Sequence, residues 1–133
     1  MPFQTKPLFL AIFPLFSVRK IAWHIPSDAE WDALTSYVES QGGCTGCAGT
    51  RLKATSGWSI GNGSDDYGFS ALPGGFGYSS IFNVVGYIGI WWSSTEHKSG
   101  IAYYRYMMSN FSGVFRYDDD IEPDLFSVRC MQD

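Results

Sequence analysis

Helical periodicity is confined to the part of the chain before Ser56, and this limit constrains the fold more than any other feature of the sequence. Trp31, Leu34 and Val38 recur at the spacing of one helical face. From Ser56 onward the sequence is rich in glycine, serine, asparagine and aromatic residues, and the helical pattern is gone. Aromatic residues make up 17% of the chain and there are 15 glycines, which suits strands and turns rather than a helical bundle. The sequence therefore predicts an α+β fold, with one or two helices packed on small antiparallel sheets with long loops.

The first helix is predicted to begin at a capping box. The Ser27 side chain can accept a hydrogen bond from an amide of the first turn, while Glu30 reaches back to the cap. Gly42 and Gly43 follow the apolar pattern, so we expect the helix to end near residue 41.

A shorter helical turn is predicted over residues 50–54. In this turn the helical phase places Leu52 toward the core. The same phase places Arg51 and Lys53 on the outside, in solvent.

Strands are predicted throughout the second half of the chain. Alternation and flanking turn residues place them at residues 87–95, 101–108, 113–117 and 125–131. The spacing between them is typical of hairpins, which implies an antiparallel sheet. In the last strand Phe126, Val128 and Cys130 share the inward phase, so Cys130 is predicted to be a buried thiol.

Length and charge exclude several classes of protein. A chain of 133 residues has room for one domain with a real core. Its formal net charge is -4, and no cluster of lysine or arginine is present. A protein that binds the phosphate backbone of nucleic acids needs such a cluster, so nucleic acid is not expected as a partner.

An apolar run over residues 7–18 sets the amino terminus apart. It is too short to span a bilayer and contains Pro7 and Pro14, so no membrane span is expected. Two interpretations stay open: the core of a targeting signal, or an edge strand. We therefore divide the chain into an atypical amino-terminal segment, residues 1–22, and a single domain, residues 23–133.

The cysteines do not form a recognisable metal site. Cys44 and Cys47 have the spacing of half a zinc site, but no second cysteine pair or histidine pair completes it. A local disulfide in the loop and two small unpaired residues are the remaining interpretations. No metal and no cofactor is expected.

Five ordered blocks of sequence resemble the Fibrobacter succinogenes major paralogous domain family. The blocks are WHIPSDAEW at 23–31, AGTRLK at 48–53, DYGFSALPGG at 66–75, WWSSTE at 91–96 and FSVRC at 126–130. The resemblance implies a C-type-lectin-like fold related to the formylglycine-generating-enzyme group. Residues 1–22 do not resemble the usual amino-terminal part of the family, and Leu125 stands where a glycine is common.

The resemblance also implies a function for residues 97–124. Some family members are variable proteins of diversity-generating retroelements, in which this segment is rewritten at asparagine codons to alter the choice of ligand. Fixed landmark residues accompany the rewritten positions in such proteins. Here the matching landmarks are Ala102, Arg105, Asn110, Val114 and Arg116.

Aromatic residues crowd the same segment, which is a physical argument for binding. Alternate residues of a strand face opposite ways, so a strand-rich stretch cannot bury all of these rings. Exposed tyrosines offer large contact areas, as they do in antibody loops. Trp91 and Trp92 must face opposite ways, and we expect one in the core and the other beneath the binding surface. The predicted ligand-binding residues are His97, Tyr104, Tyr106, Phe111, Phe115, Tyr117, Asp118, Asp119, Asp120 and Trp92.

We therefore predict a non-enzymatic ligand-binding protein that is surface-displayed or extracellular. No nucleophile and base lie at a catalytic spacing. The partner would be a protein or glycan on another cell or particle. One alternative is an adhesin or lectin-like module of fixed glycan specificity, for which residues 118–124 could supply oxygen ligands to calcium. Another is a degenerate enzyme of the formylglycine-generating type.

Overall fold

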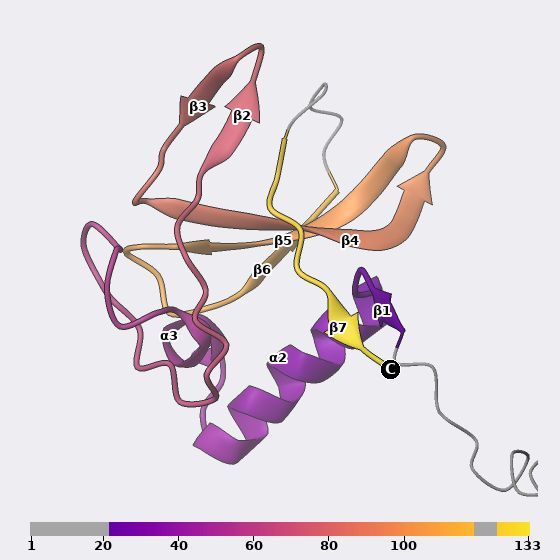
Figure 1. Cartoon of the computed structure of the whole chain (residues 1–133). Coiled ribbons are helices and arrows are strands. Elements are labelled where there is room, and N and C mark those ends of the chain that lie inside the picture. Colours follow the sequence, from indigo (N-terminus) through magenta and orange to yellow (C-terminus); the bar gives the residue numbers. More distant parts are fainter. Residues whose placement is uncertain (1–21, 119–124) are drawn as a thin grey trace, which may run out of the picture.

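The structure, a computed structural model, describes residues 22–118 and 125–133 (Figure 1). In chain order the elements are β1 (Trp23–His24), α2 (Asp28–Gly42), α3 (Ala48–Leu52), β2 (Phe76–Tyr78), β3 (Ile81–Asn83), β4 (Ile88–Lys98), β5 (Ile101–Met108), β6 (Phe115–Tyr117) and β7 (Met131–Gln132). Within these described ranges the strands form small antiparallel sheets with the orders β1–β7, β2–β3 and β4–β5–β6. The prediction of an α+β fold with helices beside small antiparallel sheets is confirmed.

Helix α2 begins and ends where the sequence predicts. The Ser27 Oγ accepts a hydrogen bond from the Glu30 N–H at 3.3 Å, and the Glu30 carboxylate accepts one from the Ser27 N–H at 2.8 Å. Gly43 follows the helix with a φ of 60°, a left-handed conformation that favours glycine. Trp31 and Val38 are buried, so the predicted apolar face is the one that packs on the core.

Helix α3 covers a slightly earlier stretch than the predicted residues 50–54. Leu52, its last residue, is fully buried as predicted. The prediction for Lys53 is wrong, because this residue is only 2% exposed. Its backbone is extended and bridges to Ala71, so the helical phase no longer sets the direction of its side chain.

The three-stranded sheet β4–β5–β6 crosses the middle of the molecule, with α2 and α3 lying on one side (Figure 1). Strand β5 has the predicted bounds, β4 continues to Lys98, and β6 is shorter than expected. Trp91 pairs with Arg105, and Trp92 pairs with Tyr104. Alternation therefore places Trp91 and Arg105 on the helix side and the other pair on the opposite side. The core on the helix side is formed by Trp31, Val38, Ala48, Leu52, Trp58, Ala71, Trp91 and Met107.

A buried arginine joins this sheet to α2. Arg105 is 2% exposed, and its Nη1 donates to Asp28 Oδ1 at 2.7 Å. Its Nη2 donates to the Asp28 carbonyl oxygen at 3.1 Å and to Asp32 Oδ1 at 2.6 Å. The exposed Arg116 of β6 reaches the same Asp28 carboxylate through Nε at 3.1 Å. Two of the family landmarks therefore hold the central sheet against the first turn of α2.

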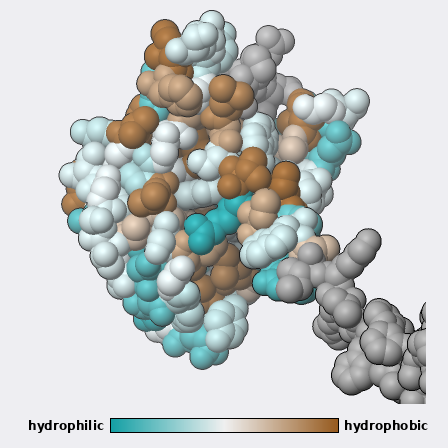
Figure 2. All heavy atoms as spheres, in the orientation of Figure 1, coloured by the Kyte–Doolittle hydropathy of each residue, from teal (hydrophilic) through white to brown (hydrophobic). Residues whose placement is uncertain are grey.

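The β2–β3 hairpin was not expected from the sequence. Its two-residue turn is Ser79 and Ser80, with φ values of 44° and 72°. Turns with two positive φ values usually carry asparagine, aspartate or glycine, so this one lacks the sequence signal. Ile81 and Phe82 on the hairpin are 62% and 70% exposed. Figure 2 shows hydrophobic side chains gathered at this end of the molecule.

The closing segment differs from the predicted strand over residues 125–131. Leu125 bridges to Gly77 of β2 and Ser127 bridges to Trp91 of β4, before the short strand β7 pairs with β1. Because the segment passes from one sheet to the next, a single inward phase does not apply to it. Val128 and Cys130 are both exposed, so the prediction of a buried thiol is wrong.

A histidine ties β1 to α2 and to the end of the chain. The His24 Nε2 lies 3.0 Å from Glu30 Oε1, and its Nδ1 lies 2.7 Å from Asp133 Oδ1. The hydrogen bond with Glu30 is the main cause that raises the pKa of His24 above its ordinary 6.5. The pKa of Glu30 falls to about 2, chiefly because the Ser27 backbone N–H donates to its carboxylate. The sequence spacing did not reveal this pairing.

We expect the stability of the protein to depend on pH through this group. The raised pKa of His24 means that its contribution is complete below pH 6.5 and is lost as the pH rises through the folded-state pKa. The lowered pKa of Glu30 means that its contribution is complete above pH 4.5 and is lost toward pH 2. Thermal unfolding of His24→Gln should therefore differ most from the parent between these limits, and the difference should shrink by about pH 9.

His97→Gln is the matched control for this experiment, because it removes the other histidine and leaves the His24 contacts intact. Comparison of the two variants separates the loss of the His24 contacts from the loss of a histidine as such. A difference between His24→Gln and the parent that is constant across the whole pH range would contradict the expectation.

Some predictions concern residues outside the described ranges. The choice between a targeting signal and an edge strand falls on residues 1–22, of which only Ala22 is described. Asp119, Asp120 and the acidic residues up to Asp124 also lie outside the described residues. Among the helices that the structure describes, none has both the length and the apolar character needed to cross a bilayer.

Candidate functional site

Seven rings form one continuous cluster on the side of the β4–β5–β6 sheet that faces away from the helices. The cluster, which we call the aromatic face, consists of Trp92, Tyr104, Tyr106, Phe111, Phe115, Tyr117 and Phe126. Ring centroids are 4.4 Å apart for Trp92 and Phe126, and 5.1 Å apart for Tyr106 and Phe115. Six of the ten predicted ligand-binding residues therefore lie together.

Strand register explains why these rings meet. Tyr104 of β5 lies directly opposite Trp92 of β4 and Tyr117 of β6. Two residues further on, Tyr106 lies opposite Phe115. Opposite residues on one face of an antiparallel sheet have neighbouring Cβ atoms, so their rings pack across the strands.

Exposure increases from the centre of the aromatic face to its edge. Tyr104 is 8% exposed, because it lies on the central strand with rings on several sides. Tyr104 therefore lies beneath the surface of the aromatic face, and its predicted part in ligand binding stays a prediction. Trp92, Tyr106 and Phe115 are half-buried, while Phe111 and Tyr117 are 50% and 48% exposed. Buried rings thus support exposed ones, as the strand argument predicts.

Phe126 belongs to the aromatic face but was not among the binding residues predicted from the sequence. Its centroid lies 4.9 Å from that of Tyr104, so it covers the central ring. The sequence assigned it to the inward face of a long strand, whereas it packs from a segment that crosses between sheets. The available signal was the turn-forming sequence of residues 118–124 shortly before it, after which the chain need not continue in the preceding sheet.

A buried lysine holds the turn that carries Phe111. The Lys53 Nζ donates to the carbonyl oxygens of Met108 at 3.1 Å and Phe111 at 3.0 Å. It also lies 5.2 Å from the centre of the Trp58 ring. Burial lowers the pKa of Lys53 below its ordinary value. Sequence reasoning missed this residue because helical phase placed it in solvent.

We expect Lys53→Met to loosen this turn. Two carbonyl oxygens would lose their buried donor, which should cost about 1 to 2 kcal/mol and speed amide hydrogen exchange around Phe111. The control is Arg51→Met, which removes an equal charge from a surface ion pair with Asp66 and should cost less than about 1 kcal/mol. Unchanged exchange at the turn in Lys53→Met would contradict the proposed role.

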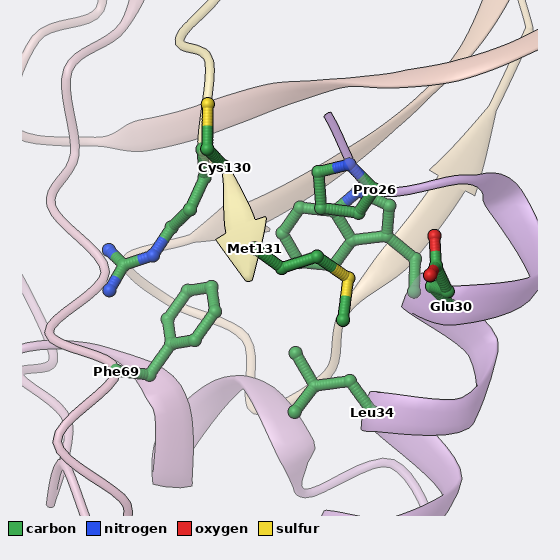
Figure 3. Close-up of a pocket in the computed structure, with 8 residues that line it drawn as sticks. Pro26, Glu30, Leu34, Phe69, Cys130 and Met131 are labelled. Atoms are coloured by element: carbon green, nitrogen blue, oxygen red, sulfur yellow. The ribbon is translucent and has the colours of Figure 1, made fainter. Parts of the chain in front are cut away.

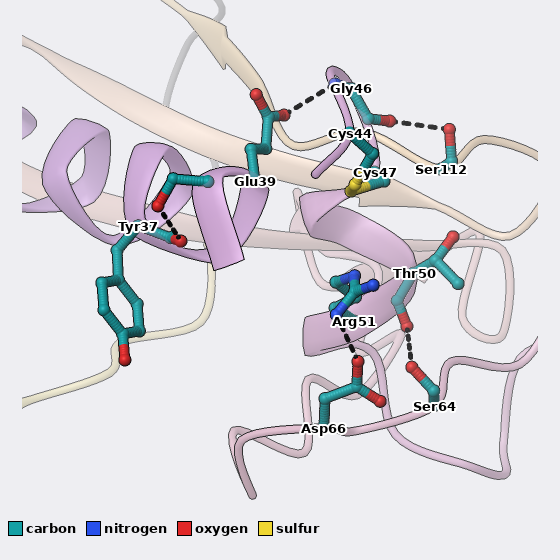
Figure 4. Close-up of a disulfide and its surroundings, with 11 residues drawn as sticks. Tyr37, Glu39, Cys44, Gly46, Cys47, Thr50, Arg51, Ser64, Asp66 and Ser112 are labelled. Carbon is teal, nitrogen blue, oxygen red and sulfur yellow. Dashed lines mark hydrogen bonds and ion pairs between the residues drawn. A yellow bond between two sulfur atoms is a disulfide. The ribbon is translucent and has the colours of Figure 1, made fainter. Parts of the chain in front are cut away.

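The loop closed by the Cys44–Cys47 disulfide contacts the same turn (Figure 4). Of the two interpretations left open by the sequence, the structure has the local disulfide. The Gly46 N–H in its loop donates to Glu39 Oε1 at 2.8 Å, and the Gly46 carbonyl oxygen accepts from Ser112 Oγ at 2.7 Å. The disulfide loop therefore connects α2 to the residue that follows Phe111.

Two predicted site residues lie in a separate group at the end of the β4–β5 hairpin. The His97 Nδ1 lies 2.8 Å from the Tyr103 hydroxyl and 3.3 Å from Asp118 Oδ2. The Arg116 guanidinium lies 4.0 Å from the centre of the Tyr103 ring. Tyr103 and Arg116 alternate with residues of the aromatic face, so this group is on the helix side of the sheet. His97 and Asp118 are therefore not part of the aromatic face.

The described residues thus define a small α+β domain that presents a supported aromatic face. The family model of the Fibrobacter succinogenes major domain matches residues 21–132. The chain belongs to this family, as the five blocks of sequence predicted. No curated protein and no solved structure is similar enough to the chain to count as a match.

Proposed function

We propose that this protein is a non-enzymatic ligand-binding domain with a C-type-lectin-like fold, and that the aromatic face is its binding surface. The observation that carries the proposal is the packing of exposed rings on less exposed ones. Tyr117 packs against the buried Tyr104, and Phe111 packs against the half-buried Phe115. Exposed aromatic residues on a rigid support lose little entropy on binding and act as anchors in interfaces. The partner in this proposal is a protein or glycan on another cell or particle, met at a cell or particle surface.

The landmark residues support the further proposal that a retroelement diversifies this segment. Arg105 is buried against α2, and Val114 packs against the core. Phe111, which lies between Asn110 and Val114, and Tyr117, which follows Arg116, are exposed. A segment with buried anchoring residues and exposed residues between or beside them can change the exposed residues while the sheet keeps its contacts with the helices. The same arrangement of buried and exposed residues would also suit a relative whose sequence is not diversified.

The DNA beside the gene provides the test of diversification. We expect a reverse transcriptase gene and a near-identical repeat of the codons for residues 97–124 that differs at adenines. The differences should fall in codons of exposed residues such as Phe111 and Tyr117, and should spare Arg105 and Met107. Differences concentrated in the codons of the two buried residues, or the absence of such a repeat, would overturn the hypothesis that a retroelement diversifies this segment.

A glycan array tests the binding surface itself. We expect the Phe111→Ser, Tyr117→Ser double variant to lose binding to the array if the aromatic face is the binding surface. Tyr37→Ser is the control and should keep binding, because Tyr37 is a similarly exposed tyrosine on α2. Binding that needs calcium and survives the double variant would instead support a lectin of fixed specificity.

A further inference from the structure

A pocket lies on the other side of the molecule from the aromatic face, between α2 and the closing segment. It has a volume of about 270 Å³. Figure 3 shows Leu34 and Met131 on one side of it and Phe69 on the other. The residues that line it are Pro26, Glu30, Trp31, Leu34, Phe69, Arg129, Cys130 and Met131. None of them belongs to the aromatic face, so a ligand here would be independent of the function proposed above.

The walls of this pocket are mostly apolar. Pro26 and Trp31 are buried, and Leu34 and Phe69 are half-buried and pack against the core. Pockets for drug-sized ligands usually enclose about 300–1,000 Å³, so this one suits a smaller molecule. An apolar group the size of a phenyl ring or a branched alkyl chain fits such walls.

A cation without a carboxylate partner lies at the edge of the pocket. The Arg129 guanidinium lies 4.1 Å from the centre of the Phe69 ring, and no ion pair joins it to any other described residue. Its planar donors suit a carboxylate, which can accept two parallel hydrogen bonds. Stacking on Phe69 holds those donors beside the apolar wall.

The acidic groups near Arg129 are already engaged. Asp65 accepts from the Ser70 N–H at 2.6 Å, and the contact with Ser70 is the main cause that lowers the pKa of Asp65. Arg129 acts on this carboxylate only through its longer-range charge. Glu30 accepts from Ser27 and lies beside His24. Glu30 stays negatively charged but is engaged by Ser27 and His24, so among the described lining residues Arg129 is the charged group that no ion pair engages.

Trp31, which lines the pocket, has a buried indole N–H that finds no acceptor among the described residues. The residue as a whole is 2% exposed. Buried donors in folded proteins nearly always have a partner. The Nε1 atom itself is buried, so Trp31 is a reporter of binding at this wall and is not counted among the contacts of the ligand.

We propose that this pocket binds a small carboxylic acid with a compact apolar body, such as an arylalkanoate. The carboxylate pairs with Arg129, and the apolar body lies against Phe69, Leu34 and Met131. The site is therefore selective for anions over neutral molecules of the same shape.

Calorimetric titration of the full chain with 3-phenylpropanoate at pH 7 tests this. We expect a Kd of about 1 mM or tighter. The neutral isostere 3-phenylpropanamide should bind about tenfold more weakly, since it cannot form a charge-assisted pair. In the protein labelled with ¹⁵N at tryptophan, the Trp31 indole signal should shift more than the other four, because Trp31 alone among the 5 tryptophans lines the pocket.

Two variants make the outcome decisive. Arg129→Gln should weaken binding of the acid about tenfold and leave binding of the amide unchanged. Arg51→Gln is the matched control, because it removes the same charge from a residue that does not line the pocket. Leu34→Trp should abolish binding by filling the space. Equal binding of acid and amide, equal binding by Arg129→Gln and the parent, or shifts confined to other tryptophans would each overturn the proposal.

Discussion

Replacement of Arg105 by methionine is expected to lower the free energy of unfolding by about 3 kcal/mol. The guanidinium is 2% exposed and makes three hydrogen bonds to the first turn of α2. Removing it leaves Asp28, whose side chain is only 15% exposed, with the weaker contact from Arg116. For a domain of this size the melting temperature should fall by about 10 °C, which calorimetry or circular dichroism can measure.

Arg116→Met provides a control that involves the same carboxylate. The Arg116 side chain is 47% exposed, so its ion pair with Asp28 is largely screened by water and should contribute less than about 1 kcal/mol. Equal losses in the two variants would show that burial is not what makes Arg105 important, and would contradict its assignment as the link between sheet and helix.

Tyr104→Ala is expected to cost about 3 kcal/mol or more, even though the residue lies on the candidate binding face. Its ring contacts those of Trp92, Tyr106, Tyr117 and Phe126, so truncation leaves a cavity at the centre of the cluster. Denaturant titration would measure the loss as a lower unfolding midpoint with an unchanged slope.

The same truncation at Tyr117 should cost about 1 kcal/mol or less, because this ring is 48% exposed. This contrast tests the physical basis of the proposed function. If Tyr117→Ala were as damaging as Tyr104→Ala, the outer rings would be part of the core, and little would remain for a ligand to contact.

Local signals in the sequence predicted the elements that depend on local chemistry. The capping box at Ser27 and Glu30 located the start of α2, and Gly43 located its end. Alternating apolar residues located β4 and β5, and strand alternation correctly implied that the aromatic residues divide between two faces. Each of these features is decided within a few residues of the chain, so a single sequence contains the information.

Features that depend on distant parts of the chain were not predicted. Lys53 is buried because Met108, at the end of β5, and Phe111, in the turn that follows, each supply a carbonyl oxygen to it from 55 and 58 residues away in the sequence. Tyr104 is buried because Phe126 covers it from the closing segment. The exposure of Cys130 follows from a segment that contacts three sheets in turn. None of these contacts can be inferred from the residues that neighbour Lys53, Tyr104 or Cys130 in the sequence.

The pairing of β1 with β7 has a practical consequence for engineering. Trp23 lies opposite Gln132, and the Asp133 N–H donates to the Ala22 carbonyl oxygen at 3.1 Å (Figure 1). The polypeptide thus enters and leaves the domain at adjacent points. Residues 22–133 could consequently be grafted into a surface loop of a carrier protein without stretching either junction, much as inserted domains are accommodated in natural hosts.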